Sequence, residues 1–114
     1  MVVVRFLGHS FFRISFKGTN VLIDPFIKET SPNPDFLRVE KTAAKEKDFK
    51  NVDIVLLSNE HFDHFEKELV EKTVQESGGC VVGHESLIRQ LNLSRRFMQP
   101  LEIGKSLALR KVKI

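Results

Sequence analysis

The sequence contains no tryptophan and no tyrosine, and its only cysteine is Cys80. A single thiol cannot form a disulfide within the chain, so a disulfide-stabilised secreted fold is excluded and a reducing, cytoplasmic location is favoured. There is no run of about eighteen apolar residues, so the sequence predicts no membrane-spanning helix. Residues 1–7 are rich in β-branched and apolar residues, which is not the pattern of a secretory signal.

A strong charge imbalance is also missing. The chain has 18 lysines and arginines against 15 aspartates and glutamates, a net charge of +3, and the two signs are well mixed. The densest basic stretch, residues 110–113, is expected to be solvated surface, because a nucleic-acid-binding protein usually gathers its positive charge on one face. We therefore expect neither a nucleic acid nor a membrane as partner.

The chain does have enough apolar material for one core. Hydrophobic residues make up 41% of its 114 residues, ten of them are phenylalanines, and charged residues make up 29%. This composition is ordinary for a soluble globular protein, and the length favours a single domain.

The beginning of the chain has the pattern of three strands. Residues 2–7 are apolar and β-branched, and residues 11–16 alternate apolar with polar side chains. Residues 21–24 form a short apolar run that ends on the carboxylate of Asp24. Lys17–Asn20 contains the residue types of a turn. We expect a three-stranded antiparallel meander.

Residues 26–52 change in character. Ser31–Pro34 contains two prolines and predicts an extended, irregular path. Residues 39–50 are rich in lysine, glutamate and alanine, which predicts a short exposed helix.

The rest of the chain predicts alternating strands and helices. Residues 53–57 form an apolar run typical of a strand that is covered on both faces. Residues 65–77 have apolar side chains at helical spacing and are followed by two glycines, which end helices. Further along we expect a strand at 80–83, a helix at 85–91, and strands at 101–103 and 107–114 joined at residues 104–105.

The residues that carry chemistry lie in the loop after the strand at 53–57. His61, Asp63 and His64 place two imidazoles and a carboxylate close together at the carboxyl end of a strand, where ligands bind in α/β sheets. These groups suit Zn²⁺, Mn²⁺ or Fe²⁺, with zinc mildly favoured. The alternative is a polar turn in which Asp63 caps the helix that begins near Phe65.

The loop resembles a known motif, the metallo-β-lactamase signature Thr-His-x-His-x-Asp-His, with Ser58 for the threonine and Asn59 for the first histidine. Three further segments resemble, in order and spacing, the opening of the ascorbate-6-phosphate-lactonase-like metal-dependent hydrolases: Phe6–Phe12, Val21–Phe26 and Asp53–Ser58. The resemblance implies an α/β fold that forms half of an αββα metallo-β-lactamase sandwich, with a mixed, mostly antiparallel sheet and helices on one face. Residues 1–114 would be the amino-terminal half, with the carboxyl-terminal half absent.

The resemblance also implies roles for single residues. In the two-metal pattern the first two histidines hold one ion, whereas the aspartate and the third histidine hold the other. An amide is a weak metal ligand, so Asn59 would hold the loop or contact substrate, and His61, Asp63 and His64 would bind one Zn or Mn ion at most. Asp63 would orient the attacking water, and Asp24 would hold the loop through hydrogen bonds. His9 would contact substrate, act as an extra ligand, or be a turn histidine bonded to backbone.

The function implied by the resemblance is hydrolysis of a small-molecule ester, lactone or phosphoester by metal-activated water. We expect the 114-residue chain to be weakly active or inactive, because the second half would supply the remaining ligands. The alternative is a non-catalytic half-fold that associates with itself or with a complementary chain, since a half-sandwich would leave one face of its sheet bare.

Overall fold

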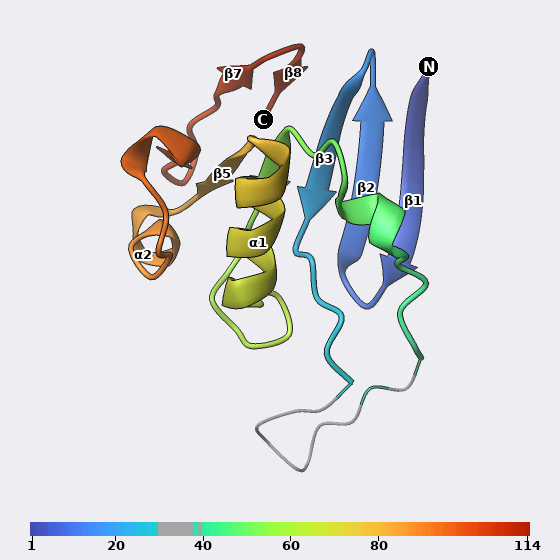
Figure 1. Ribbon diagram of the computed structural model, residues 1–114. Helices are drawn as coiled ribbons and strands as arrows, with labels where there is room; N and C mark the ends of the chain where they lie inside the picture. The colour runs from blue at the N-terminus through green and yellow to red at the C-terminus, as the bar shows by residue number, and fades with distance from the viewer. Residues whose placement is uncertain (30–37, 39) are drawn as a thin grey trace.

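The computed structural model describes residues 1–29, 38 and 40–114. Its main feature is a six-stranded sheet in the order β1-β2-β3-β4-β5-β6 (Figure 1). The strands are β1 (Val2–Gly8), β2 (Phe11–Phe16), β3 (Thr19–Ile23), β4 (Ile54–Leu56), β5 (Cys80–Gly83) and β6 (Met98–Pro100). A separate two-stranded hairpin consists of β7 (Ala108–Leu109) and β8 (Val112–Lys113).

The antiparallel meander predicted from the sequence is confirmed. β1 pairs with β2 and β2 pairs with β3, both antiparallel. The turn between β2 and β3 has positive φ at Lys17 (48°) and Gly18 (79°). Two consecutive residues with positive φ are typical of the tight type I′ turn, whose twist matches that of the strands.

From β3 onward the sheet is parallel: β3 pairs with β4, β4 with β5 and β5 with β6. The resemblance implied a mixed, mostly antiparallel sheet. The sheet is mixed, with two antiparallel pairs in the meander and three parallel pairs after it. Parallel neighbours need crossover connections. The helix α1 (Lys67–Ser77) lies in the connection from β4 to β5, and α2 (Glu85–Ile88) lies in the connection from β5 to β6.

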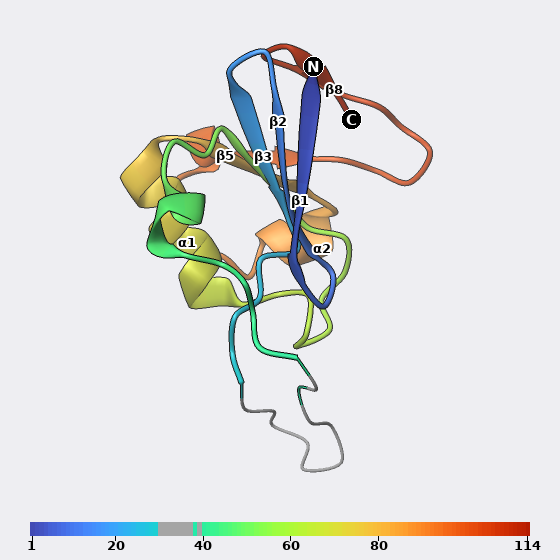
Figure 2. The ribbon, with the colours of Figure 1, turned by 90° about the vertical axis from the view of Figure 1, so that its right-hand side faces the viewer.

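The two faces of the sheet are covered differently. On one face, Val70 and Val74 of α1 and Leu87 and Ile88 of α2 are buried in the larger core cluster. On the other face, a smaller cluster is packed against side chains of the β7–β8 hairpin, and Figure 2 shows α1 and the segment leading to this hairpin on opposite sides of the strands. The helices therefore lie on one face, as predicted.

The helix predicted at 39–50 was wrong over the described residues. Only η1, a 3-10 turn at Glu46–Phe49, is present there. The preceding segment bonds to the end of β1 instead, because both the Ala43 N–H and the Thr42 hydroxyl donate to the Leu7 carbonyl. Residue 39 and the segment Ser31–Pro34, predicted to be irregular, lie outside the described residues.

The predicted strands near the carboxyl end were also wrong. Residues 101–103 are not a strand, and β6 ends directly before them, at Pro100. Residues 107–114 form the β7–β8 hairpin instead of one strand, with Arg110 at a φ of 54°. A positive φ at an arginine has no sequence signature, so the turn could not be predicted from the residue types.

Candidate metal centre

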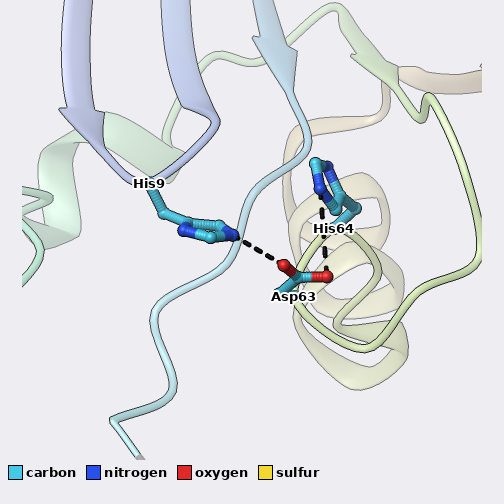
Figure 3. Close-up of side chains that lie close together, drawn as sticks. All are labelled: His9, Asp63 and His64. Atoms are coloured by element: carbon cyan, nitrogen blue, oxygen red, sulfur yellow. Dashed lines mark hydrogen bonds and ion pairs between the residues drawn. The ribbon is translucent and has the colours of Figure 1, made fainter. Parts of the chain in front are cut away.

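Two loops that are far apart in the sequence meet at one end of the sheet. The turn between β1 and β2 contributes His9, and the loop between β4 and α1 contributes Asp63 and His64 (Figure 3). One potential ligand atom from each residue lies within 4.8 Å of the others. The three side chains point toward one another, although all are partly accessible.

Local backbone irregularity aims His9 at the loop. The β1–β2 register shifts between Phe6 and Gly8, which indicates a bulge at the end of the hairpin. Gly8 has a φ of 114° and His9 a φ of 58°. Bulges re-aim side chains, and a non-glycine residue in the left-handed region is a form of strain often found at functional sites.

Asp63 lies between the two histidines. Its Oδ2 is 2.9 Å from His9 Nε2, and its Oδ1 is 3.8 Å from His64 Nε2. Desolvation acts to raise the pKa of Asp63, but the hydrogen bond from His9, a backbone hydrogen bond and the nearby imidazoles outweigh it and lower the pKa below its ordinary value. The carboxylate is therefore ionised at neutral pH, as a metal ligand must be.

His64 is oriented by Asp24. The Nδ1 atom of His64 is 2.8 Å from Asp24 Oδ2, and Ser10 Oγ is 3.0 Å from the same nitrogen. When Nδ1–H donates to this carboxylate, the lone pair of Nε2 remains available on the side of Asp63. Such a carboxylate–histidine pair is the usual way in which a ligating imidazole is fixed in tautomer and orientation.

Asp24 also holds the start of the loop. Its side chain is almost fully buried, and its carboxylate accepts hydrogen bonds from Ser58 N at 2.8 Å and Ser58 Oγ at 2.5 Å. Asp24 follows β3 and has a φ of 45°. One buried carboxylate thus connects the end of β3, the loop after β4 and the ring of His64.

Asn59 and His61 do not belong to the cluster of His9, Asp63 and His64. The Asn59 side chain accepts from His61 N at 3.0 Å and donates to Ser58 Oγ at 2.9 Å. The His61 carbonyl accepts from His64 N and Phe65 N, so the backbone makes a tight turn here. His61 is exposed and is not part of the three-residue group.

The donor set fits a divalent cation. Two imidazoles and one carboxylate are common ligands of Zn²⁺ and Mn²⁺, and three protein ligands with one open position is the pattern of catalytic zinc. Beside the set, the Phe26 ring lies 5.9 Å from the His9 ring and 6.4 Å from the Phe62 ring. These aromatic rings provide an apolar wall next to the polar groups.

The structure brings together most of the residues singled out from the sequence. His9 hydrogen-bonds to Asp63, and His64 hydrogen-bonds to Asp24. The two pairs meet where Asp63 Oδ1 lies 3.8 Å from His64 Nε2, and His61 lies outside the three-residue group. The sequence analysis missed the part played by the hydroxyls of Ser10 and Ser58. In the sequence, the only hint of this role is that Ser10 follows His9 and Ser58 precedes Asn59.

The fold and this cluster define the class of protein as a mixed α/β fold with a candidate metal centre at one end of its sheet. The family model described as a beta-lactamase superfamily domain matches residues 3–113. The chain belongs to the beta-lactamase superfamily, as the resemblance of the loop implied.

Curated relatives of the chain are UPF0173 metal-dependent hydrolases. One from Nitratidesulfovibrio vulgaris (strain Hildenborough) is 34% identical over 92 residues, which is 80% of this chain and 35% of the relative. One from Pyrococcus horikoshii is 42% identical over 64 residues, which is 56% of this chain and 24% of the relative. The chain thus aligns with about a quarter to a third of these relatives.

Solved structures show the same fold. The metallo hydrolase Igni18 from Ignicoccus hospitalis has a TM-score of 0.68 at 22% identity, with 95% of this chain and 42% of that chain covered. A putative metal-dependent hydrolase from Parabacteroides distasonis has a TM-score of 0.64 at 18% identity, with 92% and 39% covered. Within the described residues, no helix is long and apolar enough to cross a membrane.

Proposed function

We propose that this chain carries part of the active site of a metal-dependent hydrolase. The observation that supports the proposal is the convergence of Asp63, His64 and His9 from two separate loops, with their ligand atoms within 4.8 Å of one another. The curated relatives are metal-dependent hydrolases by name, which is consistent with a divalent cation at this place. We propose one Zn or Mn ion, because the residues at hand form a single donor set.

Different residues of the chain would bind the cation, orient the attacking water and exclude other water. A divalent cation bound there supplies a Lewis acid and lowers the pKa of a coordinated water to about 7. Asp63, ionised at neutral pH, accepts a hydrogen bond from the attacking water and orients it. Asp24 holds His64 in place, and the Phe26 and Phe62 rings limit the access of water on one side.

The proposed substrates are small-molecule esters, lactones or phosphoesters, in which a hydroxide adds to a carbonyl or phosphoryl centre. We further propose that residues 1–114 correspond to the amino-terminal half of a longer catalytic domain. Three donors on an open surface lack the dry, shaped cavity that hydrolysis requires, so the chain alone should turn over slowly or not at all. We also propose that the protein is cytoplasmic and that nucleic acids are not its partners.

A chimera tests this function. Residues 1–114 replace the matching segment of the Nitratidesulfovibrio vulgaris relative, and hydrolysis of p-nitrophenyl acetate, a homoserine lactone and bis-p-nitrophenyl phosphate is measured for parent and chimera. The chimera should hydrolyse the probe that the parent hydrolyses, and EDTA or Asp63→Ala should reduce its rate about a hundredfold or more. Glu68→Ala, an exposed change in α1, is the matched control. A folded chimera whose rate does not respond to Asp63→Ala would argue against the proposal.

A second candidate function is a half-fold that acts by association. The specific observation in its favour is the apolar surface of β1, where Val2, Val4 and Phe6 are 53%, 57% and 60% exposed. Alternate residues of a strand point to the same face, so these three side chains form one patch. A second copy or a complementary chain could cover it.

A further inference from the structure

We propose that His9, from the turn between β1 and β2, is the third metal ligand of this chain, beside Asp63 and His64. The ion would then be held by His9, Asp63 and His64, across two loops instead of within one. This inference rests on the proposed metal site and names its ligand set.

The Asn59 side chain hydrogen-bonds within its own loop. Both ends of its amide are used, since Oδ1 accepts from His61 N and Nδ2 donates to Ser58 Oγ. A side chain that bonds to the backbone two residues on forms a stable local turn. Turning Asn59 toward an ion would break both bonds and would offer only a neutral amide oxygen in return.

His61 is placed away from the cluster. Its imidazole is not among the groups whose ligand atoms lie within 4.8 Å of Asp63 and His64, and the residue is exposed. Its backbone is fixed on both sides, because its N–H donates to Asn59 and its carbonyl accepts from His64 N. In the structure, therefore, His61 is not among the donors gathered around Asp63.

His9, in contrast, already stands at ligand distance. A tetrahedral zinc site with bonds of about 2.0–2.2 Å places its ligand atoms about 3.3–3.6 Å apart. The closest pairs here are His9 Nε2 to Asp63 Oδ2 at 2.9 Å and His64 Nε2 to Asp63 Oδ1 at 3.8 Å. Shifts of about half an ångström would bring both pairs to the required spacing.

The backbone around His9 supports a role beyond packing. The bulge at Gly8 and the left-handed conformation of His9 are unfavourable features at the tip of a hairpin that otherwise pairs regularly. The His9 side chain is 42% exposed, so burial does not account for its orientation. Its ring lies 5.7 Å from that of His64, centroid to centroid, so the two imidazoles are close enough to share a ligand group with Asp63.

The competing role for His9 is that of a positioning residue, which hydrogen-bonds Asp63 without touching the ion. A glutamine separates the two roles, since its amide still donates a hydrogen bond but is a poor ligand for zinc. The experiment is a zinc titration of the purified chain, by competition with a chromophoric chelator, for the wild type and for His9→Ala, His9→Gln, His61→Ala and Asp63→Ala. Circular dichroism checks that each variant is folded.

We expect His9→Ala, His9→Gln and Asp63→Ala each to weaken zinc binding at least tenfold, and His61→Ala to change it less than twofold. In ¹⁵N spectra, zinc should shift the ring nitrogens of His9 and His64 but not those of His61. Wild-type affinity in His9→Gln, or a loss confined to His61→Ala, would overturn the role of His9 while the metal site itself stood. Unchanged binding in Asp63→Ala would overturn both this inference and the proposed function.

Discussion

At the scale of single residues, Asp24 connects more parts of the candidate site than any other side chain described there. It accepts hydrogen bonds from both the backbone and the hydroxyl of Ser58, and it faces the Nδ1 atom of His64. Because the carboxylate is almost fully buried, losing one of these bonds leaves a polar group without a partner inside the protein. Asp24 should therefore affect both stability and metal affinity.

Asp24→Asn is predicted to lower the free energy of unfolding by about 1–3 kcal/mol. The amide is uncharged, and it replaces one of the two accepting carboxylate oxygens with an NH2 group that cannot accept a hydrogen bond. It should weaken zinc binding about 10–100-fold, because the ring of His64 loses its orientation. Urea denaturation and zinc titration measure the two effects. Glu68→Gln on the exposed surface of α1 serves as control. Wild-type zinc affinity in Asp24→Asn would show that His64 does not depend on this contact.

Cys80 is predicted to be a slow thiol. Burial raises its pKa above the ordinary value; Arg110 acts in the opposite direction with a smaller effect, and Asp53 adds to the increase. At pH 8 the folded protein should therefore have less thiolate than free cysteine, and alkylation by iodoacetamide should be slower. The rate should rise as the pH passes 9, and unfolding in urea should restore ordinary reactivity. Equal rates for the folded chain and free cysteine would contradict this prediction.

The residues of the site illustrate what a sequence can and cannot reveal. Spacing pointed to His61, Asp63 and His64, and the resemblance added His9 and Asp24 as candidates. The separation of His61 from the cluster could not be predicted, because spacing within a loop does not fix the directions of its side chains. The pairing of His9 with Asp63 joins residues 54 positions apart, and only the three-dimensional fold brings them together.

At the scale of elements, the two glycines after α1 are predicted to be needed for different reasons. Gly78 has a φ of 71° and no atom within 4 Å of an added Cβ, so Gly78→Ala should cost about 1–2 kcal/mol through conformation alone. At Gly79 an added Cβ would lie 2.4 Å from the Val52 carbonyl oxygen, so Gly79→Ala must displace the backbone and should cost about 3 kcal/mol or more.

Thermal or urea unfolding of the two alanine variants measures this difference. The pair forms its own control, because the substitutions are identical and adjacent. A smaller loss of stability in Gly79→Ala than in Gly78→Ala would show that the contact between α1's carboxyl end and the segment before β4 is looser than the structure indicates.

Elements with a regular pattern were predicted well. The boundaries of β2 and β5 match the sequence prediction, because alternation or a short apolar run bounded by turns identifies a strand. The segment at 40–50 was misjudged because helix propensity is weak compared with tertiary contacts. Asp48, buried in η1, is paired there with Arg5 of β1, and such a contact cannot be seen in a local pattern.

At the scale of the whole molecule, the uneven covering of the sheet is the dominant feature. The helices bury one face, while on the other face Val2, Val4 and Phe6 of the edge strand β1 remain largely exposed. Contiguous exposed apolar side chains usually mark an interaction surface. We predict that the chain self-associates at micromolar concentration through this face.

Val4→Lys should shift the chain toward monomer, because a charged side chain placed in the patch would have to be desolvated on association. Sedimentation velocity over a range of concentrations measures the effect. Lys72→Ala in α1 is the control, since it alters an exposed residue on the helical side. Equal sedimentation of wild type and Val4→Lys at every concentration would exclude this face as the contact.

The central claim is that one divalent cation is held where the β1–β2 turn meets the loop before α1. The most direct measurement is anomalous diffraction at the zinc edge from crystals of the chain grown with one equivalent of zinc. We predict a single peak about 2.0–2.2 Å from His9 Nε2, a carboxylate oxygen of Asp63 and His64 Nε2. A peak at His61 or elsewhere, with none among these three atoms, would contradict the account.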